Sequence, residues 1–167
     1  ATQKFGVKPD IITMAKAITN GAIPMGGVAV TDEIYDTVVN SAPGNGIEFF
    51  HGYTYSAHPA ACAAGIATQK IYESDGLFEN AANLESYFLD AVFSLRDHPL
   101  VADIRGIGMM AGVEVHPEGA PGARGGEMQK AMFWNGLHVK WTGDNAIIAP
   151  AFVAERKHVD EIIDKFR

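Results

Sequence analysis

Lys16 has clear potential for chemistry, because it lies in the middle of an apolar run. Residues 11–18 surround it with isoleucine, methionine and alanine side chains and contain no other charge. This pattern predicts a buried strand, or the end of one, that carries a lysine. Lysine is rarely buried, and a desolvated amine loses its charge more easily, so it can act as a nucleophile that forms a Schiff base. The alternative is a lysine that reaches from a strand or helix end into solvent.

A second candidate site lies at Thr54, within residues 52–56 (GYTYS) and shortly before a predicted helix that begins near Pro59. Hydroxyl groups, free backbone N–H groups and a helix N-terminus all favour the binding of a phosphate. The alternative is a threonine in a structural turn. His51 and the tyrosines beside Thr54 are expected to pack and hydrogen-bond rather than to catalyse. The histidines lack the spacing and carboxylate neighbours of a metal pair, so no metal is expected.

The elements that must position these residues fall into two groups that meet at about residue 75. In the first group we predict strands over residues 10–16 and 26–30, a helix from Thr31, a loop over 40–50 and a helix over 58–75. In the second group we predict helices over residues 78–96, 127–134 and around 159–166, and strands over residues 101–104, 109–115, 137–140 and 146–149. Residues 117–126 are rich in glycine and proline and predict a mobile loop. Arg105 is expected to bond loop carbonyls rather than an anion.

The composition limits the class of protein. A net charge of −7 makes the chain a poor candidate for nucleic-acid binding. A hydrophobic fraction of 47% with 20% charged residues is typical of a globular protein. No apolar run reaches membrane-spanning length, and no signal peptide is visible. The single cysteine, Cys62, rules out an internal disulfide. We therefore expect a cytoplasmic protein with neither a nucleic acid nor a membrane as partner.

Three segments in the expected order carry a resemblance to a known family. They are residues 9–24 (PDIITMAKAITNGAIP), residues 51–59 (HGYTYSAHP) and residues 103–114 (DIRGIGMMAGVE). Together they resemble the class III aminotransferases, the pyridoxal 5'-phosphate (PLP) enzymes of fold type I that include the omega-amino acid:pyruvate transaminases. The resemblance implies an α/β fold, with residues 1–75 as the C-terminal part of the PLP-binding large domain. Residues 76–167 would then be the C-terminal small domain, an α+β unit.

The resemblance also implies roles for three residues. Lys16 would hold the cofactor, and Thr54 would reach the cofactor phosphate of a neighbouring subunit, which implies a homodimer or a higher homo-oligomer. Lys140 stands where the family usually carries an arginine that binds the substrate carboxylate. Because lysine is a point charge rather than a planar fork, Lys140 would bind a carboxylate less specifically. It could also mark a substrate without an α-carboxylate or a longer one, or be a surface lysine.

The implied activity is transfer of an amino group from an amine or omega-amino acid to a keto acid such as pyruvate. The family places the partner of the pyridine nitrogen, the aromatic that stacks on the cofactor and a phosphate loop before the lysine segment. We therefore expect the chain to be the later portion of a longer enzyme and to bind PLP poorly by itself. Two alternatives stay open: a class III relative such as an aminomutase, and a non-catalytic fragment that acts as a folded dimerisation or interaction module.

Overall fold

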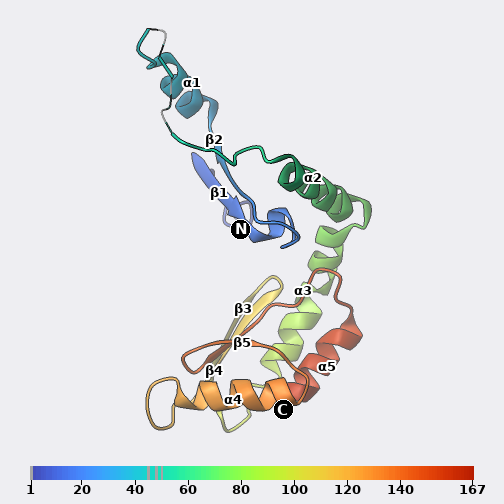
Figure 1. Ribbon diagram of the computed structural model, residues 1–167. Helices are drawn as coiled ribbons and strands as arrows, with labels where there is room; N and C mark the ends of the chain where they lie inside the picture. Colours follow the sequence, from blue (N-terminus) through green and yellow to red (C-terminus); the bar gives the residue numbers. More distant parts are fainter. Residues whose placement is uncertain (1, 45, 48, 50) are drawn as a thin grey trace. The chain divides into compact units, whose positions relative to one another are not determined.

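The computed structural model describes residues 2–44, 46–47, 49 and 51–167, and it divides into two compact units (Figure 1). The N-terminal unit is Ala1–Ser74 and the C-terminal unit is Asp75–Arg167. Each has its own sheet, of two strands in the first and four in the second. The predicted loop over 40–50 lies partly outside the described residues.

The N-terminal unit is built on an antiparallel pair of strands, β1 (Ile11–Ala15) and β2 (Gly26–Val30). Their register runs from Ile11 opposite Val30 to Ala15 opposite Gly26, and both strands were predicted at these places. A short 3₁₀ helix, η1 (Lys16–Ile18), follows β1. Helix α1 (Asp32–Asn40) follows β2 and has acidic residues in its first turn. Their negative charges interact favourably with the positive end of the helix dipole.

Helix α2 (Pro59–Ser74) completes this unit and contacts η1. The prediction that Pro59 opens the helix is confirmed, because the first turn of a helix does not use the N–H that proline lacks. The buried residues described in the unit are few: Thr19, Ala61 and Gly65. Gly65 lies so close to Met25 that an added Cβ would stand 3.3 Å from the sulfur.

The C-terminal unit contains a four-stranded antiparallel sheet in the order β3-β4-β6-β5. The strands are β3 (Val101–Ile107), β4 (Met110–Val115), β5 (Lys140–Thr142) and β6 (Asn145–Ile148). Burial alternates along β4 as it should when one face of a sheet is covered and the other is open.

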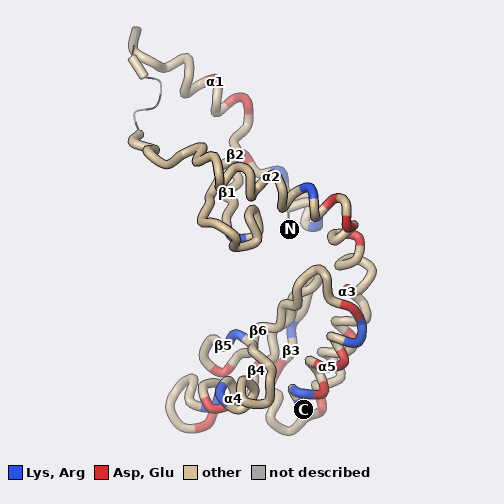
Figure 2. The backbone as a smooth tube through the Cα atoms, turned by 45° about the vertical axis from the view of Figure 1, so that its right-hand side comes forward, with Lys and Arg blue, Asp and Glu red and all other residues tan. Residues whose placement is uncertain are grey.

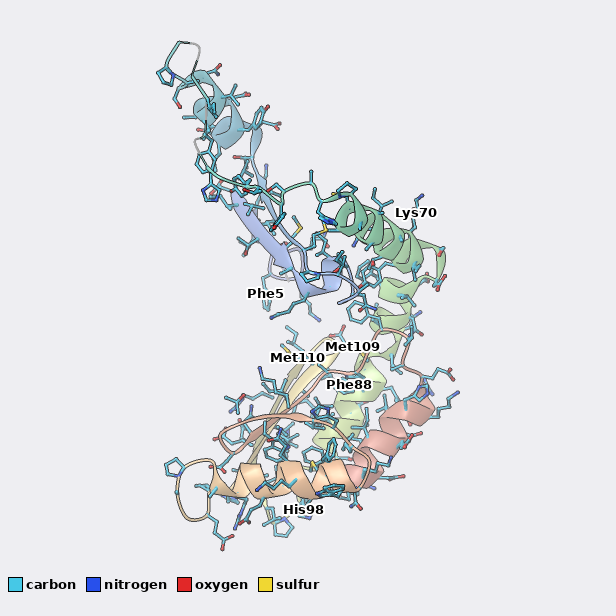
Figure 3. The ribbon with its side chains drawn as sticks, in the orientation of Figure 1. Phe5, Lys70, Phe88, His98, Met109 and Met110 are labelled. Carbon is cyan, nitrogen blue, oxygen red and sulfur yellow. The ribbon has the colours of Figure 1, made fainter. Side chains whose placement is uncertain are left out.

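Three helices accompany this sheet: α3 (Leu77–Phe93), α4 (Ala123–Trp134) and α5 (Arg156–Phe166). Helix α3 packs on β3 and β4 and against α5, whereas α4 packs on β5. The buried residues of α3 recur at helical spacing, and Phe88, which Figure 3 labels, is fully buried among them. Burial of a side chain of this size stabilises the fold by about 1.5–3 kcal/mol, so this core holds the unit together.

Two predicted elements of the C-terminal unit are placed differently in the structure. The predicted mobile loop over 117–126 is wrong in its second half, because α4 begins at Ala123. The predicted strand over 137–140 lies instead at Lys140–Thr142. The start of α4 is decided by contacts with Asp144, a residue distant from it in sequence.

Basic and acidic residues are interspersed along the chain (Figure 2). Within the part of the chain that the structure describes, no helix combines the length and the apolar character needed to cross a membrane.

Candidate active site

Lys16 occupies the point where the chain leaves β1 and enters η1. Strand pairing ends immediately before it, at Ala15 opposite Gly26. The backbone of Lys16 is left-handed, with a φ of 56°. This conformation costs a non-glycine residue about 1–2 kcal/mol. Strain of this kind persists only where the surrounding structure imposes it, and it is frequent at functional sites.

The predicted burial of the lysine segment is wrong for this chain. Every residue of β1 is exposed, and so is Lys16. Between 40% and 54% of the surface of Ile11, Ile12 and Met14 is exposed to solvent. A strand that is apolar on both faces is typical of a sheet covered on both sides. The described residues of the N-terminal unit supply the neighbouring strand β2 but no such covering layers, so they leave the Lys16 side chain exposed.

The segment after Lys16 is held by side chains of α2 and by its own turn. The Tyr72 hydroxyl donates a hydrogen bond to the Ala17 carbonyl at 3.0 Å, and the Gln69 amide makes a longer one of 3.5 Å to the Ile18 carbonyl. Thr19 is buried, and its hydroxyl donates to the Ile23 carbonyl at 2.7 Å. The roles of Tyr72 and Gln69 leave no signal in the sequence, because no local pattern shows which distant carbonyl a helix side chain reaches.

Thr54 lines an open cavity of about 600 Å³ in the N-terminal unit. The cavity lies between residues 23–26 and residues 53–58, with Ala61 and Cys62 of α2 at its end. Its lining residues include four that carry a hydroxyl group, Tyr53, Thr54, Tyr55 and Ser56. The Thr54 hydroxyl donates to the Gly52 carbonyl at 3.0 Å, so its proton is used locally and its oxygen lone pairs remain available.

The residues of this cavity fit one part of PLP, its phosphate. Hydroxyl groups near the start of a helix suit an anion, although the lining includes neither lysine nor arginine. Lys16 is not part of the lining, whereas residues 23–26, which follow it in the chain, are. The structure therefore brings Thr54 beside the lysine segment without bringing the Lys16 side chain into the same cavity. The nearby His51 packs edge-on against Tyr53, at 4.0 Å between ring centroids.

Lys140 begins the edge strand β5 of the C-terminal unit. It is exposed, and among the described residues its side chain forms neither a hydrogen bond nor an ion pair. It stands opposite Ile147 on β6. Ile147 in turn stands opposite Gly112 on β4, and Gly112 stands opposite Arg105 on β3, so these residues form one row across the sheet. Two cationic side chains therefore share one row of the sheet, at its two edges.

Arg105 is satisfied by carboxylates of its own sheet. Its guanidinium lies 2.7 Å from Asp103 and 2.9 Å from Glu114. The hydrogen bond that Arg105 donates to Glu114 and the negative charge of both acids raise the pKa of Arg105. The expectation that Arg105 bonds loop carbonyls is wrong, because pairing of β3 with β4 places Asp103 opposite Glu114, next to the arginine.

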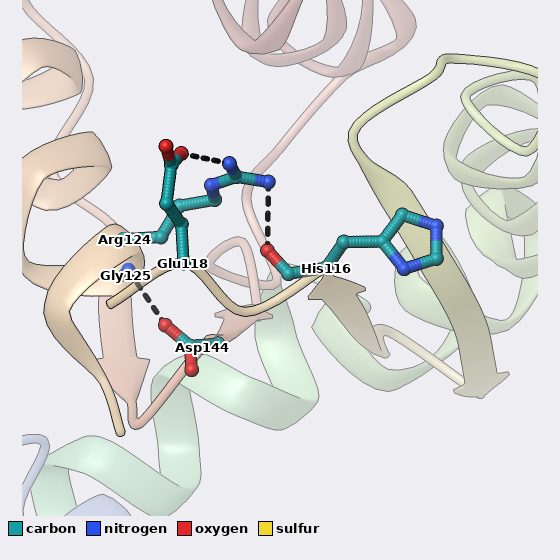
Figure 4. Close-up of polar contacts among 5 residues, drawn as sticks. All are labelled: His116, Glu118, Arg124, Gly125 and Asp144. Carbon is teal, nitrogen blue, oxygen red and sulfur yellow. Dashed lines mark hydrogen bonds and ion pairs between the residues drawn. The ribbon is translucent and has the colours of Figure 1, made fainter. Parts of the chain in front are cut away.

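The turn after β5 is attached to the start of α4 by Asp144 (Figure 4). One carboxylate oxygen accepts a hydrogen bond from the backbone N–H of Gly125 at 2.9 Å, which Figure 4 shows. The other accepts one from the backbone N–H of Gly122 at 3.1 Å. Arg124 in the same turn binds the His116 carbonyl and the Glu118 carboxylate. A carboxylate at a helix start satisfies donors that the helix itself cannot use. These contacts explain why α4 begins inside the predicted loop.

Among the described residues, no group of three or more histidine, cysteine or acidic side chains is placed to hold a metal ion.

Comparison with solved structures defines the class of protein. The chain superimposes on a transaminase with L-ala with a TM-score of 0.94 at 27% identity, which covers 99% of this chain and 40% of that one. An (S)-enantioselective omega-transaminase from Thermomicrobium roseum gives a TM-score of 0.89 at 37% identity, over 99% and 38% of the two chains. The predicted α/β fold class is therefore confirmed as that of transaminases.

Sequence comparison gives the family. Residues 1–167 match the family Aminotransferase class-III, and the chain belongs to this family. An omega-aminotransferase of Caulobacter vibrioides is 47% identical over 168 residues, covering 100% of this chain and 38% of the relative. A beta-alanine–pyruvate aminotransferase of Pseudomonas aeruginosa is 41% identical over 162 residues, covering 96% and 36%. The chain thus spans less than two fifths of the length of these relatives. Class III aminotransferases depend on PLP.

Proposed function

We propose that this chain is a portion of a PLP-dependent omega-transaminase that transfers an amino group from an amine or omega-amino acid to a keto acid such as pyruvate. The observation that carries the proposal is Lys16, the lysine of the family's cofactor segment, in a strained backbone conformation directly after a strand. The names of the relatives, an omega-aminotransferase and a beta-alanine–pyruvate aminotransferase, support the substrate class.

Lys16 is proposed to hold the cofactor and to transfer a proton. PLP, when bound, serves as the electron sink for the bonds at the substrate carbon. The Lys16 amine is the nucleophile of this chain that would attach the cofactor aldehyde. When the substrate amine takes its place, the free Nζ atom of Lys16 can accept a proton and donate it again. Because Lys16 is exposed in this chain, lowering of its charge would require covering layers from the rest of the longer protein.

Thr54 is proposed to bind the cofactor phosphate across a subunit boundary, so that the complete site needs a homodimer or a higher homo-oligomer. The hydroxyl-rich cavity beside the start of α2 supports this assignment. Since the Thr54 proton is donated to Gly52, phosphate binding requires the hydroxyl to rotate away from that carbonyl. A purely structural threonine would keep the bond to Gly52.

Lys140 is proposed to attract the substrate carboxylate. Its exposed ammonium group, at the edge of the sheet and without a described partner, is available for an anion. We assign residues 1–75 to the end of the large cofactor domain and residues 76–167 to the small domain, and we place the enzyme in the cytoplasm.

The proposal is tested by replacing Lys16→Ala in the full-length protein and following formation of alanine from pyruvate and an amine. Activity should fall by at least about a thousandfold, because one group provides both attachment and proton transfer. Lys70→Ala is the matched control, since Lys70 is an exposed lysine of α2 in the same unit (Figure 3). It should retain full activity.

Comparable activity of the two variants would refute the role of Lys16. Absence of transamination in the unchanged full-length protein would favour the alternative of a non-catalytic dimerisation or interaction module. Migration of the amino group within one substrate, without a keto acid, would instead identify an aminomutase.

A further inference from the structure

Lys16 lies between two fixed points of the backbone. On one side, the pairing of Ala15 with Gly26 ends the β1–β2 ladder. On the other side, the Ala17 carbonyl accepts the hydrogen bond from the Tyr72 hydroxyl at 3.0 Å. Only Lys16 separates these two points, so the change of direction between strand and η1 falls on this residue. Its φ of 56° is the result.

The left-handed backbone of Lys16 requires such a constraint. A free lysine prefers negative φ, and the return to negative φ would turn the Cα–Cβ bond and the whole side chain in another direction. Strand pairing fixes only the residue before Lys16, and the turn after it is closed by two long bonds, from the Thr19 N–H to the Lys16 carbonyl at 3.2 Å and from the Asn20 N–H to the Ala17 carbonyl at 3.3 Å. The contact from α2 adds a further constraint on this turn.

Tyr72 is the strongest of the contacts that supply this constraint. It stands in the last turn of α2 and reaches across 55 positions of sequence to Ala17. The neighbouring contact from Gln69 is longer, at 3.5 Å, and therefore weaker. The Ala17 carbonyl also accepts the N–H of Asn20 at 3.3 Å, which is a long bond within the turn itself. The tyrosine thus provides the shorter of the two bonds to that carbonyl.

We propose that Tyr72 is a positioning residue that keeps the backbone of Lys16 left-handed and so aims the Lys16 amine. The inference rests on the proposed function, because it assigns Tyr72 a role through the lysine that would hold the cofactor. Tyr72 touches neither substrate nor cofactor in this role. Removal of its hydroxyl should leave the fold intact and loosen the segment that carries the lysine.

The test compares Tyr72→Phe with Tyr35→Phe in the full-length protein. Tyr35 lies on α1 and is 60% exposed, so its hydroxyl is a matched control. The first readout is the rate of amide hydrogen exchange at residues 16–20 in the cofactor-free protein. This rate should be about fivefold higher in Tyr72→Phe, because the loss of one hydrogen bond changes an opening equilibrium by about that factor. The second is the PLP concentration at which half of Lys16 becomes attached after reduction with borohydride, which should rise by about the same factor.

A third readout is the pH at the midpoint of the absorbance change of the bound cofactor. Compared with the unchanged protein, this pH should shift in Tyr72→Phe and be the same in Tyr35→Phe. If exchange, half-saturation and pH midpoint are the same in both variants, the inference is overturned while the proposed function stands. If Lys16 of the unchanged protein never becomes attached to PLP, the proposed function fails and the inference fails with it.

Discussion

Lys16 and Lys140 carry the same amine in two different settings. Lys16 is exposed, but its backbone is fixed in a rare conformation between a strand and a tethered turn. Lys140 has an ordinary place in an edge strand, and its long side chain carries a charge with no described partner. The direction of Lys16 is therefore set by the fold, whereas Lys140 acts mainly through its charge. A lysine of the second kind binds a carboxylate as a flexible point charge.

Replacement of Lys140→Arg should raise kcat/KM for α-keto acids. A guanidinium forms two parallel hydrogen bonds with a carboxylate and holds it in one orientation. We expect an increase of about three- to tenfold, the equivalent of about one additional charge-assisted hydrogen bond. The measurement is the steady-state kinetics of the full-length enzyme with pyruvate and with an amine donor that has no carboxylate.

Lys130→Arg serves as the control for this change, because Lys130 is an exposed lysine of α4. It should leave the kinetics of both substrates unaltered. An unchanged kcat/KM for pyruvate in Lys140→Arg would count against a carboxylate-binding role and favour a surface lysine.

At the scale of elements, the β5–β6 turn and the start of α4 form one joint. Asp144 links the two through the N–H groups of Gly122 and Gly125. Gly125 is in close contact with the turn, since an added Cβ would lie 2.0 Å from the Gly143 carbonyl oxygen.

Substitution of Gly125→Ala should therefore destabilise the protein by about 1–3 kcal/mol, because a backbone atom has to move to admit the methyl group. The next residue provides the control: an added Cβ at Gly126 meets nothing within 4 Å. Gly126→Ala should be neutral or stabilise by up to about 1 kcal/mol, since alanine favours a helix over glycine. The urea midpoints of the two variants measure the difference, and equal midpoints would show that the joint is not tightly packed.

The sequence predicted those elements whose signals are local. Strands β1 and β2, the start of α2 at Pro59 and the apolar spacing of α3 were expected from patterns of neighbouring residues. The start of α4 was missed because its stabilising carboxylate, Asp144, comes 19 residues after Gly125. The surroundings of Arg105 were missed because its partners are set by strand register rather than by its own turn.

At the scale of the whole molecule, the two units differ in how completely they are packed. The C-terminal unit has a core of fully buried side chains that includes Phe88, Val92, Val113 and Val159. The N-terminal unit, which carries Lys16 and Thr54, leaves its sheet exposed. Burial of Lys16 could not be predicted correctly from its apolar neighbours, because burial depends on layers that the described residues do not provide. Tests of the site therefore belong in the full-length protein.

The central claim is that Lys16 holds the cofactor. The most direct measurement is to saturate the full-length protein with PLP, reduce it with borohydride so that attachment becomes permanent, and map the modified lysine by mass spectrometry of peptides. We expect one modified peptide, the one that contains Lys16, at close to one cofactor per chain. Modification at a different lysine, or none at saturating PLP, would contradict this claim.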